Sequence, residues 1–312
     1  MIEHRSSSAF GVAAAMAAGV VAATVILGCT GADLSCPTTP DPGKGGVRLA
    51  VIGDYGADSG DEQGVSDLVH CLRPDLVATV GDNDYFHTAT IDDAVGQYFH
   101  DFIGGYRGAY GEGSPKNRFW PTPGNHDWDD AHLAPYLEYF ALPGNERYYE
   151  VDAGLVRLFA LDSDPREPDG AGERSAQAKW LERELGASTA CFNLITFHHA
   201  PYGSGDFPAP TPRMRWPFVE WGADAVLTGH VHVYERLQIG GIPYFVTGNG
   251  GYDLGELGKP VAGSRVRDDD HFGAMLVTAT TEGITYEFYD TTGERRDSLW
   301  VPARCDATPN GP

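Results

Sequence analysis

Basic residues are scarce in this chain of 312 residues: 22 Lys and Arg stand against 44 Asp and Glu, which gives a formal net charge of −22. Nucleic acid is therefore disfavoured as the main partner, because its affinity for proteins comes largely from basic side chains. A small phosphate ester remains compatible with this composition, provided that bound cations reverse the local charge. The charge balance thus favours a small-molecule substrate over a polyanion.

The chain contains only five cysteines, and none of them forms a Cys-x-x-Cys pair. The absence of such a pair disfavours a zinc site built from thiolates. Apart from Cys29, the remaining set of Cys36, Cys71, Cys191 and Cys305 is even and can form two disulfides in an oxidising compartment. A Cys36–Cys305 bond would join the two ends and leave Cys71 with Cys191, but three pairings are possible and the sequence does not choose among them.

The amino terminus has the composition of an export signal. Residues 10–27 form an apolar run rich in Ala and Val that follows Arg5, as in a secretory signal peptide. The run ends in Ile26-Leu27-Gly28-Cys29, which resembles a bacterial lipobox in which Cys29 would carry lipid and become the first mature residue. A signal cleaved elsewhere, an uncleaved anchor helix and a cytoplasmic chain are the alternatives.

We therefore expect an exported protein, either a periplasmic or cell-surface lipoprotein or otherwise a secreted one, which touches a membrane only through lipid on Cys29. The expected organisation is a signal at 1–29, a Pro/Gly-rich linker at 30–46, one folded domain at 47–303 and a tail at 304–312. No internal repeat follows the signal, and no sequence feature favours a particular oligomeric state.

Short apolar runs alternate with helical patterns, which indicates an α/β domain. The opening unit is a strand at 48–53, a helix at 63–72 and a buried strand at 76–80. Further helices are expected at 91–102, 132–140, 173–185 and 216–221. Further strands are expected at 147–152, 155–161, 191–197, 224–228, 233–239, 243–247, 274–279 and 284–289.

Asp, Asn and His residues follow several of these strands, and we expect them to converge on Asp82. Reactive groups in open α/β sheets gather beyond the carboxyl ends of strands. The pair His230 and His232, at i and i+2 of an extended segment, would point to one side and reach one metal cluster. The blocks concerned are Asp54-Tyr55-Gly56, Gly81-Asp82-Asn83-Asp84-Tyr85, Gly124-Asn125-His126-Asp127 on a loop, His198-His199-Ala200-Pro201 and Gly229-His230-Val231-His232.

In this order, the five blocks resemble the signature blocks of calcineurin-like metallophosphoesterases. Tyr85, three residues after Asp82, and the continuation Val233-Tyr234-Glu235-Arg236 are similar to the purple acid phosphatase branch. The resemblance covers about residues 47–301. It implies an α/β fold with a two-sheet β-sandwich flanked by helices and a dinuclear metal site at the strand ends.

The resemblance also implies roles for individual residues. Asp82 would bridge two metal ions, and His199 is preferred to His198 because it stands two residues before Pro201. His126 would be catalytic and would be oriented by Asp127. The implied ligands are Asp54, Asp82, Tyr85 and His232 for one metal, and Asp82, Asn125, His199 and His230 for the other.

This donor set suits iron, zinc or manganese. A Tyr85 phenolate favours Fe(III) at its position, with Zn(II), Fe(II) or Mn(II) at the other. Such a pair would activate hydroxide for direct attack on a phosphate monoester, without a phosphoenzyme. Unlike some members of the branch, the chain has no additional His at 202–207, so proton donation would rest on His126, on metal-bound water or on Asp206. Asp84 and His87 are treated as bystanders or supporting residues.

Two alternatives remain open. The same metal core could serve a phosphodiesterase or a nucleotide hydrolase, although Tyr85 favours the monoesterase. The chain could also be an inactive metal-binding surface lipoprotein. Hydrolysis of a monoester and of the matching diester separates these functions.

Overall fold

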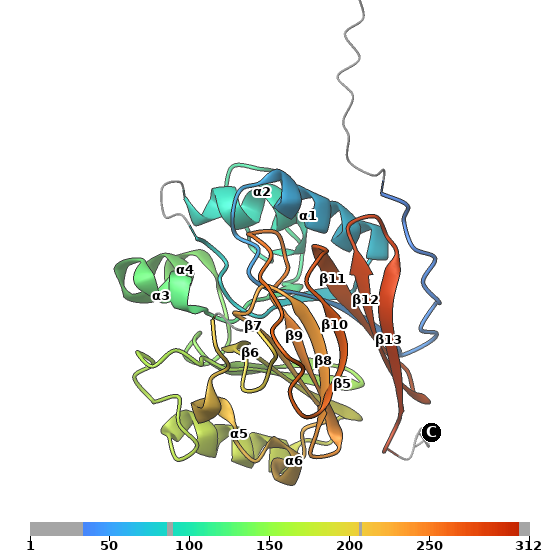
Figure 1. The fold of residues 1–312 in the computed structure, drawn as a ribbon. Helices are drawn as coiled ribbons and strands as arrows, with labels where there is room; N and C mark the ends of the chain where they lie inside the picture. The colour runs from blue at the N-terminus through green and yellow to red at the C-terminus, as the bar shows by residue number, and fades with distance from the viewer. Residues whose placement is uncertain (1–33, 86–89, 206–207, 306–312) are drawn as a thin grey trace, which may run out of the picture. The chain divides into compact units, whose positions relative to one another are not determined.

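The structure is a computed structural model that describes residues 34–85, 90–205 and 208–305, all of which belong to one compact unit. Two mixed β-sheets pack face to face, and helices cover their outer sides (Figure 1). This arrangement confirms the predicted two-sheet sandwich flanked by helices. The export signal and Cys29 lie outside the described residues.

The first sheet has the strand order β13-β12-β11-β1-β2-β3, and the second has the order β10-β8-β9-β7-β6-β5-β4. The first contains β1 (Val47–Ile52), β2 (Leu76–Thr79), β3 (Phe119–Trp120), β11 (Gly273–Ala279), β12 (Gly283–Asp290) and β13 (Arg295–Pro302). The second contains β4 (Tyr149–Ala153), β5 (Val156–Ala160), β6 (Phe192–His199), β7 (Ala225–Gly229), β8 (Tyr234–Ile239), β9 (Ile242–Thr247) and β10 (Ser264–Asp268).

Helices form the outer layers. The longer ones are α1 (Gly60–Leu72) and α5 (Ala176–Ala187), and the shorter ones are α2 (Gln97–Phe99), α3 (Asn125–Asp129), α4 (Ala134–Tyr139) and α6 (Phe218–Trp221). A π-helical turn (Asp92–Gly96) precedes α2, and 3₁₀ turns occupy His100–Phe102, Ala131–Leu133 and Pro212–Met214. Among the described residues, no helix has both the length and the apolar character needed to cross a membrane.

The alternation of side chains along β1 shows how the layers are built. Leu49 and Val51 face the core between the two sheets, whereas Ala50 and Ile52 face the core beneath α1 and α2. Successive residues of a strand point to opposite faces, so a continuous apolar run can be buried on both sides. A third core lies between the second sheet and α5 and α6, where Leu181 and Phe218 pack on the sheet.

The centres of both sheets are parallel, and this feature positions the site. Strands β1, β2 and β3 run in parallel in the first sheet, and β5, β6, β7 and β9 do so in the second. Their carboxyl ends therefore open toward the same edge of the sandwich. The polar residues that follow β1, β2, β6 and β7 meet there.

Three strands were not predicted from the sequence: β3, β10 and β13. β3 has two residues, no residue of β10 is fully buried, and β13 has a single buried residue, so β10 and β13 lack the apolar pattern of a buried strand. The prediction that Asn125 lies on a loop is also wrong, because it opens the short helix α3.

The two disulfides join Cys36 to Cys71 and Cys191 to Cys305. This is one of the three pairings that the sequence allowed, and it is not the one that joins the two ends to each other. The Cys36 bond ties the predicted linker to α1, and the Ser35 amide donates to the carbonyl of Thr292 at 3.0 Å. Residues 34–46 are thus held against the folded domain.

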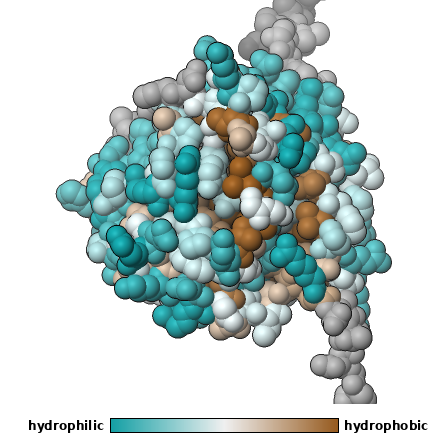
Figure 2. Space-filling model, turned by 60° about the horizontal axis from the view of Figure 1, so that its bottom comes forward, coloured by the Kyte–Doolittle hydropathy of each residue, from teal (hydrophilic) through white to brown (hydrophobic). Residues whose placement is uncertain are grey.

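The face drawn in Figure 2 is mostly hydrophilic, with hydrophobic side chains gathered in the middle of the view. Trp300, on the edge strand β13, is the most exposed of the large hydrophobic side chains in the described part of the chain, at 57%.

Candidate metal centre

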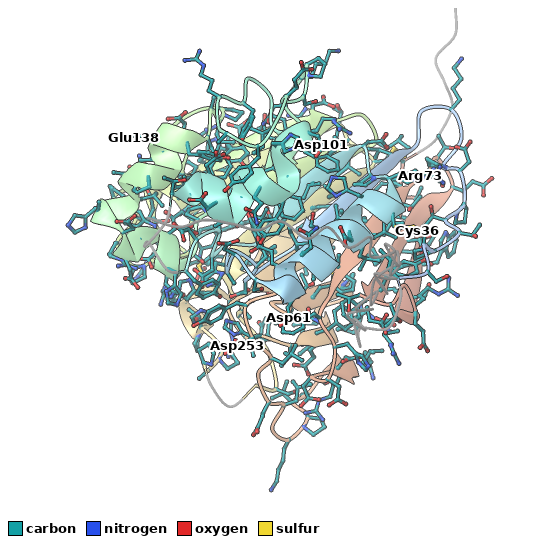
Figure 3. All side chains as sticks on the ribbon, turned by 90° about the horizontal axis from the view of Figure 1, so that it is seen from above. Cys36, Asp61, Arg73, Asp101, Glu138 and Asp253 are labelled. Atoms are coloured by element: carbon teal, nitrogen blue, oxygen red, sulfur yellow. A yellow bond between two sulfur atoms is a disulfide. The ribbon has the colours of Figure 1, made fainter. Side chains whose placement is uncertain are left out.

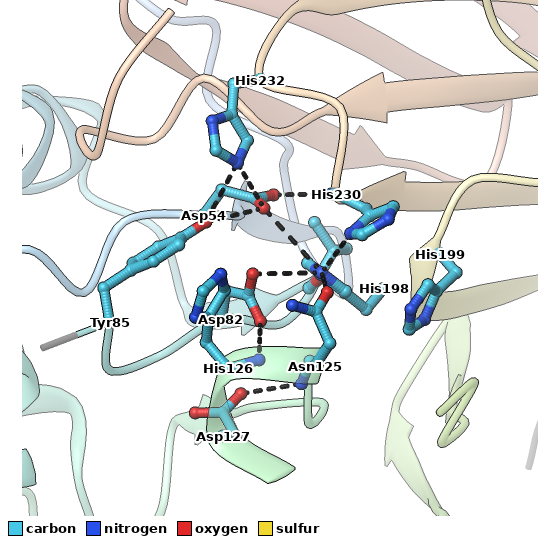
Figure 4. A network of polar contacts seen from close by, with 12 residues as sticks. Asp54, Asp82, Tyr85, Asn125, His126, Asp127, His198, His199, His230 and His232 are labelled. Carbon is cyan, nitrogen blue, oxygen red and sulfur yellow. Dashed lines mark hydrogen bonds and ion pairs between the residues drawn. The ribbon is translucent and has the colours of Figure 1, made fainter. Parts of the chain in front are cut away.

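The site begins with three residues whose backbone is left-handed. Asp54, Asp82 and His230 have φ angles of 56°, 55° and 69°, which are uncommon for residues other than glycine. They lie within three residues of the ends of β1, β2 and β7. Such conformations cost free energy and persist where the surroundings hold them, and here the His230 amide donates to the Asp54 carboxylate at 2.8 Å. The turns aim the side chains toward one another, across the gap between the two sheets (Figure 4).

One group of donor atoms surrounds Tyr85, and we call it the tyrosine position. The Tyr85 hydroxyl lies 3.0 Å from Oδ1 of Asp54 and 3.1 Å from Nε2 of His232. Nε2 of His232 lies 3.3 Å from the same Asp54 oxygen. The three atoms form a compact triangle of one phenol, one carboxylate and one imidazole.

A second group surrounds His198, and we call it the asparagine position. Nε2 of His198 lies 3.0 Å from Oδ1 of Asn125, 3.1 Å from Nδ1 of His230 and 3.2 Å from Oδ2 of Asp82. Asp82 is 1% exposed and stands between the two groups. Among the described residues, ligand atoms of Asp54, Asp82 and His198 all lie within 4.8 Å of one another.

The atoms gathered around Nε2 of His198 are ones that bind cations well: a carboxylate oxygen, an amide oxygen and an imidazole nitrogen. Nδ1 of His198 contacts the carbonyl of Val80 at 2.9 Å, and because a carbonyl only accepts, that nitrogen carries the hydrogen. In the neutral ring Nε2 then presents a lone pair toward an amide oxygen, a carboxylate and another imidazole. A single added proton could serve only one of these acceptors. Carboxylate, amide and imidazole ligands suit iron, zinc and manganese.

The raised pKa values of Tyr85 and His198 express the same shortage of positive charge. Burial, together with Asp54 and Asp82, raises the pKa of the Tyr85 hydroxyl well above its usual range. Burial alone would lower the pKa of His198, but Asp82 and Asp54 outweigh it and raise this pKa to about 10. Burial and the neighbouring His198 lower the pKa of His230 to about 3. A cation at the site would lower the pKa of Tyr85 and of His198, opposite to these shifts, and would lower the pKa of His230 further.

His126 lies beside the cluster, and its side chain is 38% exposed. Its amide donates to Oδ1 of Asp82 at 2.9 Å, and its ring contacts the ring of Tyr85, with centroids 4.5 Å apart. The nearest carboxylate to its ring nitrogen is that of Asp129, with Nδ1 and Oδ2 4.0 Å apart. The imidazole is therefore held at the rim and is accessible to a bound ligand.

The prediction that Asp127 orients His126 is wrong. The buried Asp127 carboxylate accepts hydrogen bonds from the Gly124 amide at 2.7 Å, the Asn83 amide at 3.1 Å and the Asn83 side chain at 2.9 Å. Asp127 thus joins the loop after β2 to the start of α3. Its role is to hold the segments that carry Asp82 and Asn125 together.

The structure also differs from the sequence at the His198-His199 pair. The imidazole of His198 contacts Asn125 and Asp82. The ring of His199 lies beside that of His230, with centroids 4.4 Å apart (Figure 4), and its Nδ1 lies 2.8 Å from the Ser163 hydroxyl. β6 extends to His199, and successive residues of a strand point to opposite sides. The contacts with Asn125 and Asp82 favour His198 as the ligand, and the choice of His199 from its spacing to Pro201 stays a prediction.

The other predicted ligands, Asp54, Asp82, Tyr85, Asn125, His230 and His232, lie together, although their ligand roles stay predictions. The expected extended segment at His230-Val231-His232 is instead a bend, and its two imidazoles join different positions. Asp84 is buried near the site. His87 and Asp206 lie outside the described residues.

Two residues at the site were not singled out from the sequence, although their loop was a candidate for substrate specificity. Tyr252 stacks on Tyr85, with ring centroids 3.7 Å apart, and the Asp253 carboxylate contacts Nδ1 of His232. Their segment follows Asn249-Gly250-Gly251, a turn that marks no chemistry by itself. Together with parts of the cluster they line a cleft of about 440 Å³. The lining residues are Asp82, Asn125, His126, Pro208, His230, His232, Tyr252, Asp253 and Gly255.

Two packed sheets with a cluster of carboxylate, imidazole, amide and phenol groups at their shared edge define a metallophosphoesterase. The chain belongs to the calcineurin-like phosphoesterase family, whose model matches residues 47–234. The expected family is therefore confirmed.

Purple acid phosphatases are among its relatives. The chain is 28% identical over 244 residues to purple acid phosphatase 15 of Arabidopsis thaliana, which covers 65% of this chain and 45% of that protein. It is 25% identical over 247 residues to purple acid phosphatase 23 of the same plant, which covers 66% of this chain and 51% of that protein. The chain thus spans about half the length of these curated relatives.

Solved structures show the same fold. The purple acid phosphatase PPD1 from yellow lupin seeds has a TM-score of 0.66 at 18% identity, over 82% of this chain and 54% of that one. GAP50, described as the anchor in the inner membrane complex of Plasmodium, also has a TM-score of 0.66, at 16% identity, over 85% of this chain and 91% of that one. The fold alone therefore does not establish catalysis.

Proposed function

We propose that this protein is an exported, metal-dependent hydrolase of phosphate monoesters. One observation carries the proposal: two groups of donor atoms share Asp82 in a cleft, with an accessible imidazole, His126, at the rim. The similarity to purple acid phosphatases supports the choice of a monoester substrate. Tyr85 supports it as well, because the diesterase branches that the sequence resembles usually carry another residue there.

The chain's own residues would hold two metal ions. Asp54, Tyr85 and His232 would bind one at the tyrosine position. Asn125, His198 and His230 would bind the other at the asparagine position, with Asp82 shared. A phenolate ligand favours Fe(III) at the tyrosine position, with Zn(II), Fe(II) or Mn(II) at the asparagine position. When bound, the two ions supply a lowered pKa for water and neutralise the charge on phosphoryl oxygens.

His126 would then act on the substrate itself. Its amide is fixed to Asp82 and its ring is packed on Tyr85, so the imidazole is held at the edge of the cleft. From there a ring N–H can donate a proton to the leaving oxygen of the ester. Such a positioned acid typically contributes about 10²–10⁴-fold to the rate.

Export is supported by the two disulfides among the described residues, because disulfides persist in oxidising compartments. It is also supported by the apolar run at residues 10–27. We propose a periplasmic or cell-surface lipoprotein anchored through Cys29, or otherwise a secreted protein.

The test is hydrolysis of a chromogenic phosphate monoester and of the matching diester by purified protein, combined with metal analysis and a visible spectrum. We expect two metals per chain, faster monoester hydrolysis, and a broad visible band that Tyr85→Phe abolishes. Two zinc ions and no colour would reject iron. Preferential diester hydrolysis would reject the monoesterase, and a metal-replete protein without either activity would be a binding protein.

His126→Asn tests the proton donor. We expect it to retain both metals and to lose about 10²–10⁴-fold in turnover of a substrate with a poor leaving group, since His126 would supply the proton. His132→Asn is the matched control, because His132 is exposed and its φ of 57° suits asparagine. Unchanged turnover in His126→Asn would remove His126 from the mechanism.

A further inference from the structure

The segment at residues 249–255, which we call the 249–255 loop, follows β9 and lies against the start of α1. The Gly250 amide donates to the Gly53 carbonyl at 2.9 Å, and the Ser59 hydroxyl donates to the Gly251 carbonyl at 3.0 Å. In Figure 3 Asp253, on this loop, lies on the same side of the molecule as Asp61 in the first turn of α1. The loop is therefore attached to the segment that carries Asp54.

Glycine is required for this attachment. A Cβ atom on Gly250 would lie 2.2 Å from the Gly53 carbonyl oxygen. Gly251 has a φ of +134°, and a Cβ there would lie 2.6 Å from Cα of Glu62. Both positions need a residue without a side chain, because backbone approaches backbone. The two glycines thus let the loop backbone lie directly against Gly53 and Glu62, which fixes the position of the loop relative to the site.

In this position the loop contacts three residues of the tyrosine position: Asp54, Tyr85 and His232. The Tyr252 amide donates to the carbonyl of Asp54 at 3.1 Å. The Tyr252 ring stacks on Tyr85, with planes 4° apart. Asp253 contacts Nδ1 of His232, and the Gly255 amide donates to the His232 carbonyl at 2.8 Å.

These contacts set the orientation of each donor atom. Asp253 requires the hydrogen of His232 on Nδ1, which leaves the lone pair of Nε2 for the tyrosine position. Tyr252 and His126 both pack on the Tyr85 ring, which restricts the direction of its hydroxyl. Supporting contacts of this kind orient metal ligands and raise their basicity.

Different residues support the asparagine position. His198 is oriented by the carbonyl of Val80. The backbone carbonyl of Asn125 accepts a hydrogen bond from Nη2 of Arg166 at 3.0 Å. Arg166 itself is held by the buried Asp164. The tyrosine and asparagine positions therefore share Asp82, but the residues that orient their other ligands come from separate parts of the chain.

We propose that the 249–255 loop, through Tyr252 and Asp253, is a positioning element that sets the metal affinity of the tyrosine position selectively. The proposal rests on the proposed metal centre. Tyr252 and Asp253 act through Tyr85 and His232 and are positioning residues. Loss of either contact weakens one of two metal-binding steps and leaves the other in place.

The test is titration of the metal-free protein with Zn²⁺ in competition with a chromophoric chelator, which yields two stepwise dissociation constants. We expect Asp253→Ala and Tyr252→Leu each to weaken one step by about 10–100-fold and to leave the other nearly unchanged. Asp253→Asn, which keeps an acceptor for Nδ1, should recover part of the loss. Asp101→Ala is the matched control, because it removes a carboxylate from another imidazole, that of His70, outside the site.

A double variant shows whether Asp253 acts through His232. If it does, Asp253→Ala should add little further loss in a His232→Ala background, because contacting residues are not additive. Thermal unfolding of the metal-free variants near the wild-type temperature would separate a local effect from misfolding.

Unchanged constants in Asp253→Ala and Tyr252→Leu, or equal weakening of both steps, would overturn this inference and leave the proposed hydrolase intact. A wild-type protein that binds two Zn²⁺ ions with the predicted response to these variants, yet hydrolyses no phosphate ester with any metal pair, would overturn the proposed function alone. A wild-type protein that binds fewer than two ions would overturn both.

Discussion

Substitution of His198 and His199 one at a time tests the assignment on which the sequence and the structure differ. Both residues are buried at the end of β6, at 0% and 7% exposure. Only His198 directs a nitrogen toward Asn125 and Asp82, at 3.0 and 3.2 Å. His198→Ala should therefore weaken metal binding, and His199→Ala should not.

The size of the effect follows from the donor set. A structural zinc site with four ligands binds with about 10–16 kcal/mol, so one ligand in four contributes about 2.5–4 kcal/mol. This corresponds to a loss of about 10²–10³-fold in affinity at the asparagine position. His199→Ala instead removes a hydrogen bond to Ser163 in a buried place, which should cost about 1–3 kcal/mol of folding stability.

The assay is the number of metals per chain after dialysis against a weak chelator, together with the midpoint of urea unfolding. We expect His198→Ala to retain one metal and His199→Ala to retain two with a lowered midpoint. The reverse pattern, in which His199→Ala loses a metal and His198→Ala keeps both, would refute the structural assignment and restore the one based on the spacing to Pro201.

Three further predictions concern stability. Asp127→Ala should lower the free energy of unfolding by about 3–4 kcal/mol, because three N–H groups lose a buried carboxylate as their acceptor. In the control Asp129→Ala, the carboxylate removed is 53% exposed and the loss should be less than about 1 kcal/mol. Equal losses in the two variants would contradict this prediction. Replacing Cys191 and Cys305 by serine should cost about 2–5 kcal/mol in urea unfolding, since this disulfide spans 114 residues, and an unchanged midpoint would show that the bond does not stabilise the fold. Asp101 raises the pKa of His70 above its usual 6.5, so their half-exposed pair should stabilise by less than about 1 kcal/mol below that pH and lose this contribution as the pH rises through the raised pKa. The unfolding midpoints of the wild type and His70→Gln should accordingly converge with rising pH, and divergence would refute the sign.

Much of the site was predictable because its residues follow apolar strands. Asp54 and Asp82 stand shortly after buried apolar runs. The strand β6, which ends in His198 and His199, has the same buried apolar pattern. The parallel order of these strands follows from the β-α-β arrangement, which brings their carboxyl ends to a common edge.

The errors arose where a local pattern had more than one spatial outcome. Two adjacent histidines end β6, and only packing against the first sheet decides that His198 contacts Val80 and Asn125 while His199 contacts Ser163. Asp127 follows His126 in the sequence, yet it faces Asn83 because α3 begins at Asn125. β13 gives no buried-strand pattern, and its pairing with β12 depends on the completed sheet.

The amino-acid order by itself determined the alternation of apolar strands with polar ends, and hence the fold class and most of the residues that meet at the site. Those features depend on local spacing and on burial, which a linear pattern records. Only the tertiary structure decided which histidine contacts Asn125 and Asp82, which cysteines pair, and that Tyr252 and Asp253 contact the tyrosine position. Contacts between segments some 170 to 200 residues apart, such as those of the 249–255 loop with Asp54 and Ser59, depend on how the layers pack, and no short stretch of sequence encodes them.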